Sequence, residues 1–197
     1  MVVESRTSRV TTALAGDAFV RDELEPHRRA IVAHCYRMLG SLSDAEDLAQ
    51  ETLVRAWQKR DQRSGASSRA WLYAIATRAC LDSLRRRKRR DQRAEIVGSD
   101  HIETYAHVGP FPDALLGPEH ALSARESINL AFIAALQLLP AKQRAALLLV
   151  DVLGWSAPEA ATLLATSQAA LNSLLQRARR TTGEREPRAP DSPASDR

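Results

Sequence analysis

Aromatic residues are scarce in this sequence of 197 residues: they make up 5% of it, whereas charged residues make up 26%. So few large rings favour small helical units with thin cores over a large sheet, and the length allows one medium domain or two small ones. Cysteine is scarce too, because Cys35 and Cys80 are alone, far apart and in no CxxC or Cys/His spacing. This usage disfavours structural zinc and is typical of a reducing cytosol.

Long apolar runs are also absent. The longest, Ala145–Val150, is much shorter than a membrane span, and the N-terminal MVVESRTSRV lacks the apolar core of a secretory signal. We therefore expect a cytoplasmic protein that does not enter a membrane. The net charge is only +4, so the basic excess matters only where it is clustered.

Helical periodicity covers the chain in two blocks, residues 16–90 and 122–182. Between them, residues 91–121 contain repeated glycine and proline with no sustained period, which predicts a flexible linker. Residues 1–15 are predicted to form a flexible arm, and residues 183–197 a disordered tail rich in proline, serine and charge. The expected fold is all-α, with two small helical domains joined by the linker.

The first block begins with two predicted helices. An amphipathic stripe that stops at Gly40 predicts a helix over residues 28–39. Ser43, with Glu46 three residues later, has the spacing of a capping box and opens a second helix that runs to about Trp57. The polar stretch that follows, with a glycine in it, predicts a loop.

The second helix concentrates negative charge in its N-terminal half, at Asp44, Glu46, Asp47 and Glu51. Acidic residues there favour the helix dipole, so one interpretation is helix stabilisation. Four carboxylates exceed what capping needs, and together with Gln50 they could dock on a basic surface of a partner. Catalysis by paired carboxylates is a weaker third interpretation, because no nucleophile or set of metal ligands lies nearby in the sequence.

A third helix is predicted from about Arg69. Its inward side is expected to hold Trp71, Leu72, Ile75, Ala76 and Ala79. It ends in six consecutive cations: Arg85, Arg86, Arg87, Lys88, Arg89 and Arg90. Such a run is typical of a disordered tail or of a nucleic-acid contact, and here it continues a helix, which favours a grip on the phosphate backbone. Whether Trp71 stacks on exposed bases, with Tyr73 beside it, or packs in the core is left open by the pattern.

The second block ends in two short helical patterns separated by a break at residues 165–167. Ser156 is expected to cap the first, with Glu159 completing a capping box. The inner faces hold Ala160, Ala161, Leu163, Leu164, Leu171, Leu174, Leu175 and Ala178. The outer face of the second helix carries Gln168, Asn172, Ser173, Gln176, Arg177, Arg179 and Arg180. This layout is typical of a helix-turn-helix whose second helix enters the major groove, and an ordinary αα-hairpin with a solvated face is the alternative.

These pieces, in this order, resemble an extracytoplasmic-function (group IV) sigma-70 factor of bacterial RNA polymerase. DAEDLAQETLVRAW resembles the core-binding helix of that family, and SRAWLYAIATRACLDSLRRRKRR resembles its helix for recognising and melting the −10 element. The stretch from LQLLPAK to LLQRARR resembles its −35-reading domain. The linker is similar to the sigma-G-type subgroup, whose members carry an additional C-terminal SnoaL-like domain. The sequence ends at Arg197 without one, so we expect either a shorter form or a piece cut from a longer protein.

The resemblance implies a DNA-binding initiation factor, with sigma domain 2 in residues 16–90 and sigma domain 4 in residues 122–182. It implies no enzymatic activity, cofactor or metal. The implied partners are core RNA polymerase, through its β′ clamp and β subunits, and promoter DNA, with an anti-sigma factor as a further candidate. The residues implied to bind polymerase are Asp44, Glu46, Asp47, Gln50 and Glu51. Those implied at the −10 region are Trp71, Tyr73, Arg78, Arg85, Arg86, Arg87, Lys88, Arg89 and Arg90. Those implied at the −35 region are Gln168, Asn172, Ser173, Gln176, Arg177, Arg179 and Arg180.

The sequence departs from the family pattern in one cluster. Ala74 stands where the family has arginine, Arg78 stands where it often has asparagine, and the loop Lys59–Ser68 lacks an aromatic residue. These positions lie where the −10 strand should be captured, so they put promoter melting in question more than core binding.

Two other classes of function remain to be compared. A stand-alone helix-turn-helix regulator that does not engage polymerase is the alternative, and it leaves the acidic helix unexplained. A hydrolase or transferase has no support, because the sequence contains no Ser/His/Asp set, glycine-rich phosphate loop or metal spacing.

Overall fold

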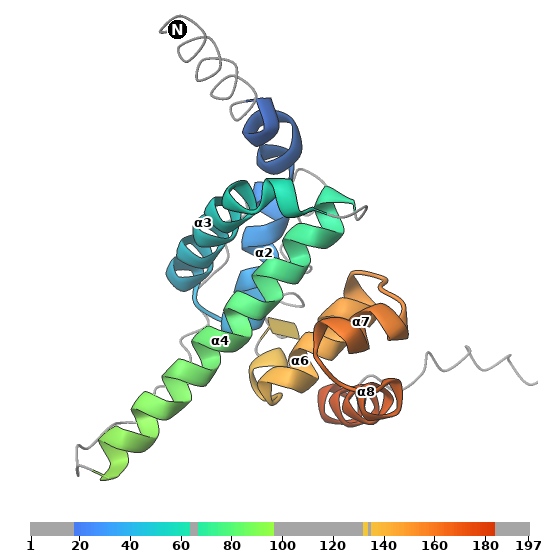
Figure 1. Cartoon of the computed structure of the whole chain (residues 1–197). Coiled ribbons are helices and arrows are strands. Elements are labelled where there is room, and N and C mark those ends of the chain that lie inside the picture. Colours follow the sequence, from blue (N-terminus) through green and yellow to red (C-terminus); the bar gives the residue numbers. More distant parts are fainter. Residues whose placement is uncertain (1–17, 64–66, 97–131, 134, 184–197) are drawn as a thin grey trace, which may run out of the picture. The chain divides into compact units, whose positions relative to one another are not determined.

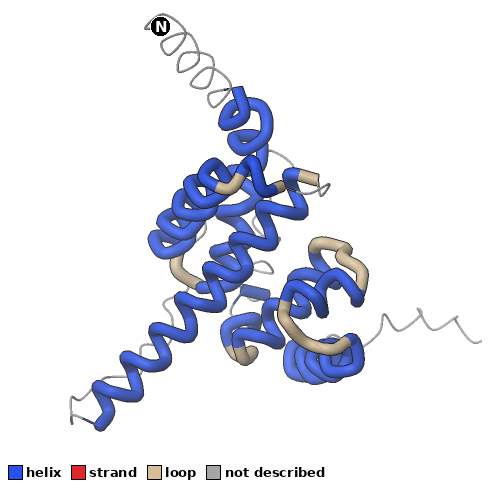
Figure 2. Tube along the Cα trace, viewed as in Figure 1, coloured by secondary structure: helices blue, strands red, loops and turns tan. Residues whose placement is uncertain are grey.

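The structure is a computed structural model and describes residues 18–63, 67–96, 132–133 and 135–183. Every regular element in these ranges is helical, which confirms the all-α prediction (Figure 2). The described residues fall into two compact units, one ending at Gln137 and the other beginning at Leu138. The predicted arm, most of the linker and nearly all of the tail lie outside the described residues. No helix in the described ranges is both long and apolar enough to cross a membrane.

Three helices that contact one another pairwise form the first unit (Figure 1): α2 (Arg28–Leu39), α3 (Leu42–Gln58) and α4 (Ser68–Ile96). A π-helical turn, η1 (Val20–Leu24), and a 3-10 turn, η2 (Glu25–His27), lead into α2. A second 3-10 turn, η3 (Arg60–Gln62), follows α3. Gly40 ends α2 in the left-handed conformation, with φ 79°, as the sequence predicted.

The start of α3 differs from the prediction, because its N-cap is Ser41 and not Ser43. The Ser41 backbone is extended, and its hydroxyl accepts a hydrogen bond from the backbone N–H of Asp44 at 3.3 Å. The left-handed turn at Gly40 makes Ser41 the first residue that can take the extended conformation of an N-cap. Asp44 therefore lies in the first turn, where a carboxylate favours the helix dipole.

Helix α4 is longer than predicted. Ser67 precedes it, and its hydroxyl accepts a hydrogen bond from the N–H of Ala70. The helix then continues to Ile96, so residues 91–96, predicted as linker, are helical. Its 29 residues span roughly 43 Å at about 1.5 Å per residue. The C-terminal part of α4 extends beyond α2 and α3 (Figure 1).

A buried polar contact joins α2 to α4. His34 is 2% exposed, and its Nε2 is hydrogen-bonded to Oγ1 of Thr77 at 2.9 Å. The ring of Tyr73 meets the His34 ring edge-on, with 5.2 Å between the centroids. Burial, and to a smaller extent the charge of Arg37, lowers the pKa of His34 to about 3, so the ring is neutral at physiological pH. This contact fixes which side of α4 faces the core.

Within residues 138–183, the described part of the second unit, there are four helical elements: α6 (Ala141–Leu147), the π-helical η6 (Leu148–Val152), α7 (Ala157–Leu163) and α8 (Gln168–Thr182). Gly154, with φ 71°, follows η6 and donates its N–H to the carbonyl of Val150, as expected of a glycine that ends a helix. The predicted capping box of α7 is present. The N–H of Glu159 donates to the Ser156 hydroxyl, and the Ser156 N–H donates to the Glu159 carboxylate at 3.0 Å.

Candidate functional site

Helix α3 buries one side and exposes the predicted acidic side. The buried residues are Ala45, Leu48, Ala49, Thr52, Leu53 and Ala56. Of the predicted partner-binding residues, Asp44, Glu46, Asp47 and Gln50 are exposed. Glu51 is half-buried and forms an ion pair with Arg55 on the same helix, with 2.6 Å between Oε1 and Nη2. Packing therefore leaves a row of carboxylates open to another molecule.

Two apolar side chains extend this exposed side of α3. Val54 is 48% exposed and Trp57 is 42% exposed, and the guanidinium of Arg60 lies over the Trp57 ring at 4.8 Å. With η1 and η2 they form a shallow groove lined by Val20, Leu24, Glu25, Arg28, Gln50, Leu53, Val54 and Trp57. The sequence prediction missed Val54 and Trp57. The signal was their helical spacing from Gln50, which places all three on one side of α3.

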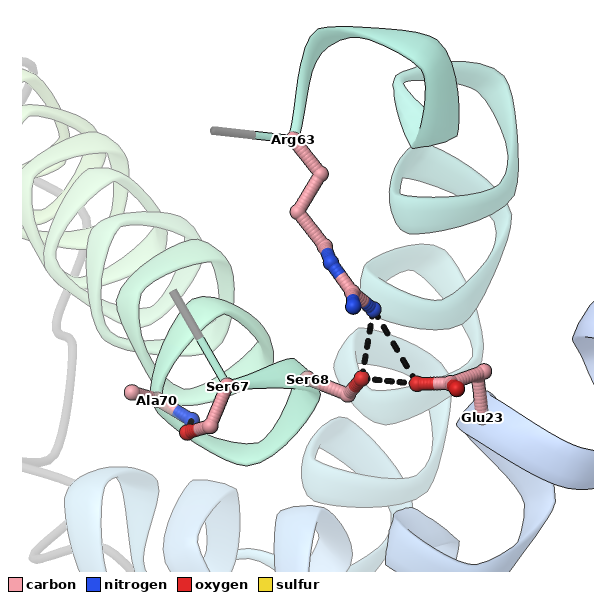
Figure 3. Close-up of polar contacts among 5 residues, drawn as sticks. All are labelled: Glu23, Arg63, Ser67, Ser68 and Ala70. Carbon is pink, nitrogen blue, oxygen red and sulfur yellow. Dashed lines mark hydrogen bonds and ion pairs between the residues drawn. The ribbon is translucent and has the colours of Figure 1, made fainter. Parts of the chain in front are cut away.

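A polar network fixes the base of the loop before α4 (Figure 3). Arg63 Nη1 donates to Glu23 Oε2 at 3.0 Å and also to the Ser68 hydroxyl, which donates to the same carboxylate oxygen. The hydrogen bond from Ser68, followed by that from Arg63, lowers the pKa of Glu23. The network joins η1, the loop and the first turn of α4. The loop thus has anchored ends although it lacks the aromatic residue of the family pattern.

The two aromatic residues at the start of α4 lie in different environments. Tyr73 is 4% exposed, lies against His34 and has the Arg69 guanidinium 5.8 Å from its ring centroid. Tyr73 therefore packs within the first unit, and its contact with DNA stays a prediction. Trp71 was expected to point inward but is only partly covered, as is Ile75.

The basic run lies on the C-terminal part of α4 and is open to solvent. Arg78, Arg86, Lys88, Arg89 and Arg90 are exposed and Arg87 is partly covered. Arg85 is exposed and forms an ion pair with Asp82 at 2.9 Å.

Arg93 was missed by the sequence prediction, because the linker was expected to start at residue 91. One concave surface on α4 is lined by Ser83, Arg86, Arg89, Arg90 and Arg93. The signal was the helical spacing of Arg86, Arg90 and Arg93. Several guanidinium groups on one surface suit phosphate oxygens, which they bind with charge-assisted hydrogen bonds.

The arrangement of α7 and α8 is that of a helix-turn-helix. Ala165 lies between them with φ 49°, a left-handed conformation that glycine adopts at lower cost. The Ser167 hydroxyl caps α8 by accepting from the N–H of Ala170 at 3.1 Å. Leu171, Leu175 and Ala178 are buried, which leaves the opposite side of α8 exposed.

All seven residues predicted to read the −35 region are exposed: Gln168, Asn172, Ser173, Gln176, Arg177, Arg179 and Arg180. Two of them already have partners within the chain. The Ser173 hydroxyl donates to the carbonyl of Ala169 at 3.1 Å, and Arg179 makes two hydrogen bonds to Asp151. The described residues contain no group of three or more His, Cys, Asp or Glu side chains that could hold a metal ion.

Two family models match the chain, one within the first unit and one that covers most of the described second unit and begins shortly before it. Residues 24–90 match the model of sigma-70 region 2, and residues 129–181 match that of sigma-70 region 4. The ECF RNA polymerase sigma factor SigG of Mycobacterium tuberculosis is 46% identical over 86% of this chain, which spans only about half (50%) of that relative's length. SigF of Caulobacter vibrioides is 33% identical over 78% of this chain and 76% of its own length.

A solved structure shares the fold. The sigma factor RpoE of Bartonella quintana, in complex with the anti-sigma factor NepR, superposes with a TM-score of 0.63 and 27% identity over 85% of this chain and 96% of that one. Two region models in the expected order, and a relative matched over 76% of its own length, show the family. The chain belongs to the ECF sigma factors of the sigma-70 family.

Proposed function

We propose that this chain is a transcription initiation factor that binds core RNA polymerase through α3 and promoter DNA through α4 and α8. The observation that carries the proposal is the exposed row on α3, with Asp44, Glu46, Asp47 and Gln50 open to solvent while the opposite side of the helix is buried. Capping explains only the first of these carboxylates. The rest suit a basic partner surface, which the family resemblance assigns to the clamp helices of the β′ subunit.

The groove beside these carboxylates extends the proposed polymerase contact. Trp57 and Val54 are exposed apolar side chains in direct continuation of Gln50. Aromatic side chains that fill a partner's pocket often carry much of the binding energy, and surrounding charges guide the approach. We therefore expect the partner helix to place apolar side chains near Trp57 and basic ones near Asp47.

Two surfaces are proposed to hold the promoter. The guanidinium groups on α4, including Arg86, Arg90 and Arg93, suit the phosphate backbone near the −10 element. The exposed amide and guanidinium groups of α8 suit base edges in the −35 major groove. In this division of roles the chain positions the polymerase and forms no covalent bond itself. An anti-sigma factor is a second proposed partner, supported by the complex in which the Bartonella quintana relative was solved.

The decisive experiment is co-elution with purified core polymerase. Replacing Asp47→Arg together with Glu51→Arg reverses two charges on the proposed contact, and like charges across an interface cost several kcal/mol. We expect the double variant to elute alone and to give no run-off transcript. Asp82→Arg is the control, because its carboxylate is 52% exposed on α4, outside the proposed polymerase contact, and the variant should co-elute like the wild type.

If the double variant still binds polymerase, α3 is not the docking helix. If the wild-type chain binds promoter DNA but never co-elutes with polymerase, the stand-alone regulator is the better description. Run-off transcription on premelted and duplex promoters then tests the altered loop before Trp71. Equal use of both templates would show that the loop supports melting.

A further inference from the structure

Arg179 of α8 is held by a carboxylate from another element of its unit. Its Nε donates to Oδ2 of Asp151 at 3.0 Å, and its Nη2 donates to Oδ1 at 2.7 Å. The two residues are 28 apart in the sequence, and Asp151 lies on η6. Both carboxylate oxygens are therefore engaged by the two parallel donors of one guanidinium, the geometry in which arginine binds carboxylates most strongly.

This ion pair lies on the surface and differs from an ordinary surface pair in its bidentate geometry. Exposed pairs contribute little, because long side chains lose rotamer freedom and water screens their charges. Here the carboxylate side chain of Asp151 is only 25% exposed, and its partner is 48% exposed. By contrast, Arg177 and Arg180 are exposed and form no ion pair with a carboxylate of the residues that the structure describes.

Arg179 lies on the edge of α8 that the proposed function assigns to DNA. It follows Asn172 by seven residues, which is close to two helical turns, so the two side chains leave the helix on the same edge. An arginine there could bind a phosphate of any sequence, because phosphate contacts carry no sequence information. The carboxylate of Asp151 competes for that same guanidinium.

We propose that Asp151 is a positioning residue that determines specificity by keeping Arg179 out of phosphate binding. The pair fixes α8 against η6. It also removes one cation from the sequence-independent attraction to phosphates, so that the remaining side chains of α8 decide which sequence is bound. The inference rests on the proposed function in one respect, that α8 faces duplex DNA. It changes the role of Arg179 from a −35 contact to an internal clamp.

The test is the salt dependence of binding by the full chain to a duplex of unrelated sequence. Each phosphate contact adds about 0.9 to the slope of log K against log salt. We expect Asp151→Asn to steepen the slope by about 0.9, because Arg179 is released to a phosphate. Arg179→Ala should leave the slope unchanged, and the double variant should behave like Arg179→Ala. Asp151→Glu keeps the carboxylate and should retain the wild-type slope.

The outcomes separate cleanly. A shallower slope for Arg179→Ala would show that this arginine already binds phosphate, and an unchanged slope for Asp151→Asn would show that Asp151 withholds nothing. Either result overturns the proposal. A variant that merely loosens the fold would lower its melting temperature without adding a phosphate contact, so thermal unfolding identifies that case. Polymerase co-elution is measured separately, and its failure would leave the salt series valid.

Discussion

Helices α3 and α8 are built on the same plan and differ in what they expose. Each begins at a serine whose hydroxyl accepts an N–H from the first turn, and each buries one apolar stripe in its own unit. The exposed side of α3 carries carboxylates followed by Val54 and Trp57. The exposed side of α8 carries amides and arginines.

The difference shows that packing and the choice of partner are determined by separate positions of an amphipathic helix. Buried residues such as Leu48 and Leu171 determine where the helix lies, and they are alike in the two cases. The solvent-facing residues determine the sign of the surface charge. A negative surface, as on α3, suits a basic protein, and a positive surface, as on α8, suits nucleic acid.

Substituting the outer face of α8 should have the largest effect on recognition. Arg177→Ala is expected to weaken promoter binding by about 1–3 kcal/mol and to relax sequence preference, because a base contact discriminates by that amount. Arg90→Ala on α4 should weaken binding to every sequence alike and make the salt slope shallower by about 0.9. Fluorescence anisotropy on promoter and scrambled duplexes measures both. Equal losses on both duplexes for Arg177→Ala would make it a phosphate contact.

Acid should lower the stability of the first unit and leave that of the second unit unchanged. The folded pKa of His34 is about 3 against an ordinary value near 6.5, so the unfolded chain binds a proton that the folded chain does not. The first unit keeps its full stability above pH 6.5 and loses it as the pH falls, by about 2 kcal/mol between pH 7 and pH 5. Residues 138–183 contain no histidine, so the second unit should be indifferent over that interval.

Urea unfolding followed by fluorescence in a Trp155→Phe background reports this loss, because Trp57 and Trp71 both belong to the first unit. His34→Gln should flatten the pH dependence whatever it does to the absolute stability. A stability that stays constant from pH 7 to pH 5 in the wild type would contradict the neutral, buried imidazole.

The smallest expected effect is at the turn that leads into α8. Ala165 has φ 49°, and glycine adopts this conformation without the steric cost of a Cβ. Relief of this strain in Ala165→Gly should stabilise the second unit by roughly 0.5–1 kcal/mol. The larger backbone entropy of glycine in the unfolded chain offsets part of that gain. Thermal unfolding checks this. A loss of stability would show that the flexibility of glycine outweighs the relief of strain.

Local signals predicted the helices well where a residue's own neighbours decide the structure. The capping box of Ser156 and Glu159 and the stop at Gly40 were both foreseen, because each depends on residues within one turn. The start of α3 was misplaced because Ser41 and Ser43 both suit an N-cap. The choice between them depends on the backbone angle of the preceding glycine, which the residue types alone do not fix.

Contacts between residues far apart in the sequence could not be predicted from it. Trp71 and Tyr73 are equally apolar in the pattern, and Tyr73 is the buried one because His34 of α2 lies opposite it. In the same way, the spacing of Asp151 and Arg179 in the sequence does not predict their ion pair. The exposure of the acidic row on α3 was expected, whereas Val54, Trp57 and Arg93 needed the structure to place them on the same surfaces.

The length of α4 determines how far its basic end moves when its first half, which the Glu23–Arg63–Ser68 network helps to hold, tilts. One end of this rod is tethered by that network, and the other end carries the cations. Residues as far as Cys80 are packed in the unit, so the part beyond them acts as an arm of about 24 Å, and a tilt of roughly 5° in the packed part moves its end by about 2 Å. A shift of that size is enough to break a hydrogen bond from an arginine to a phosphate.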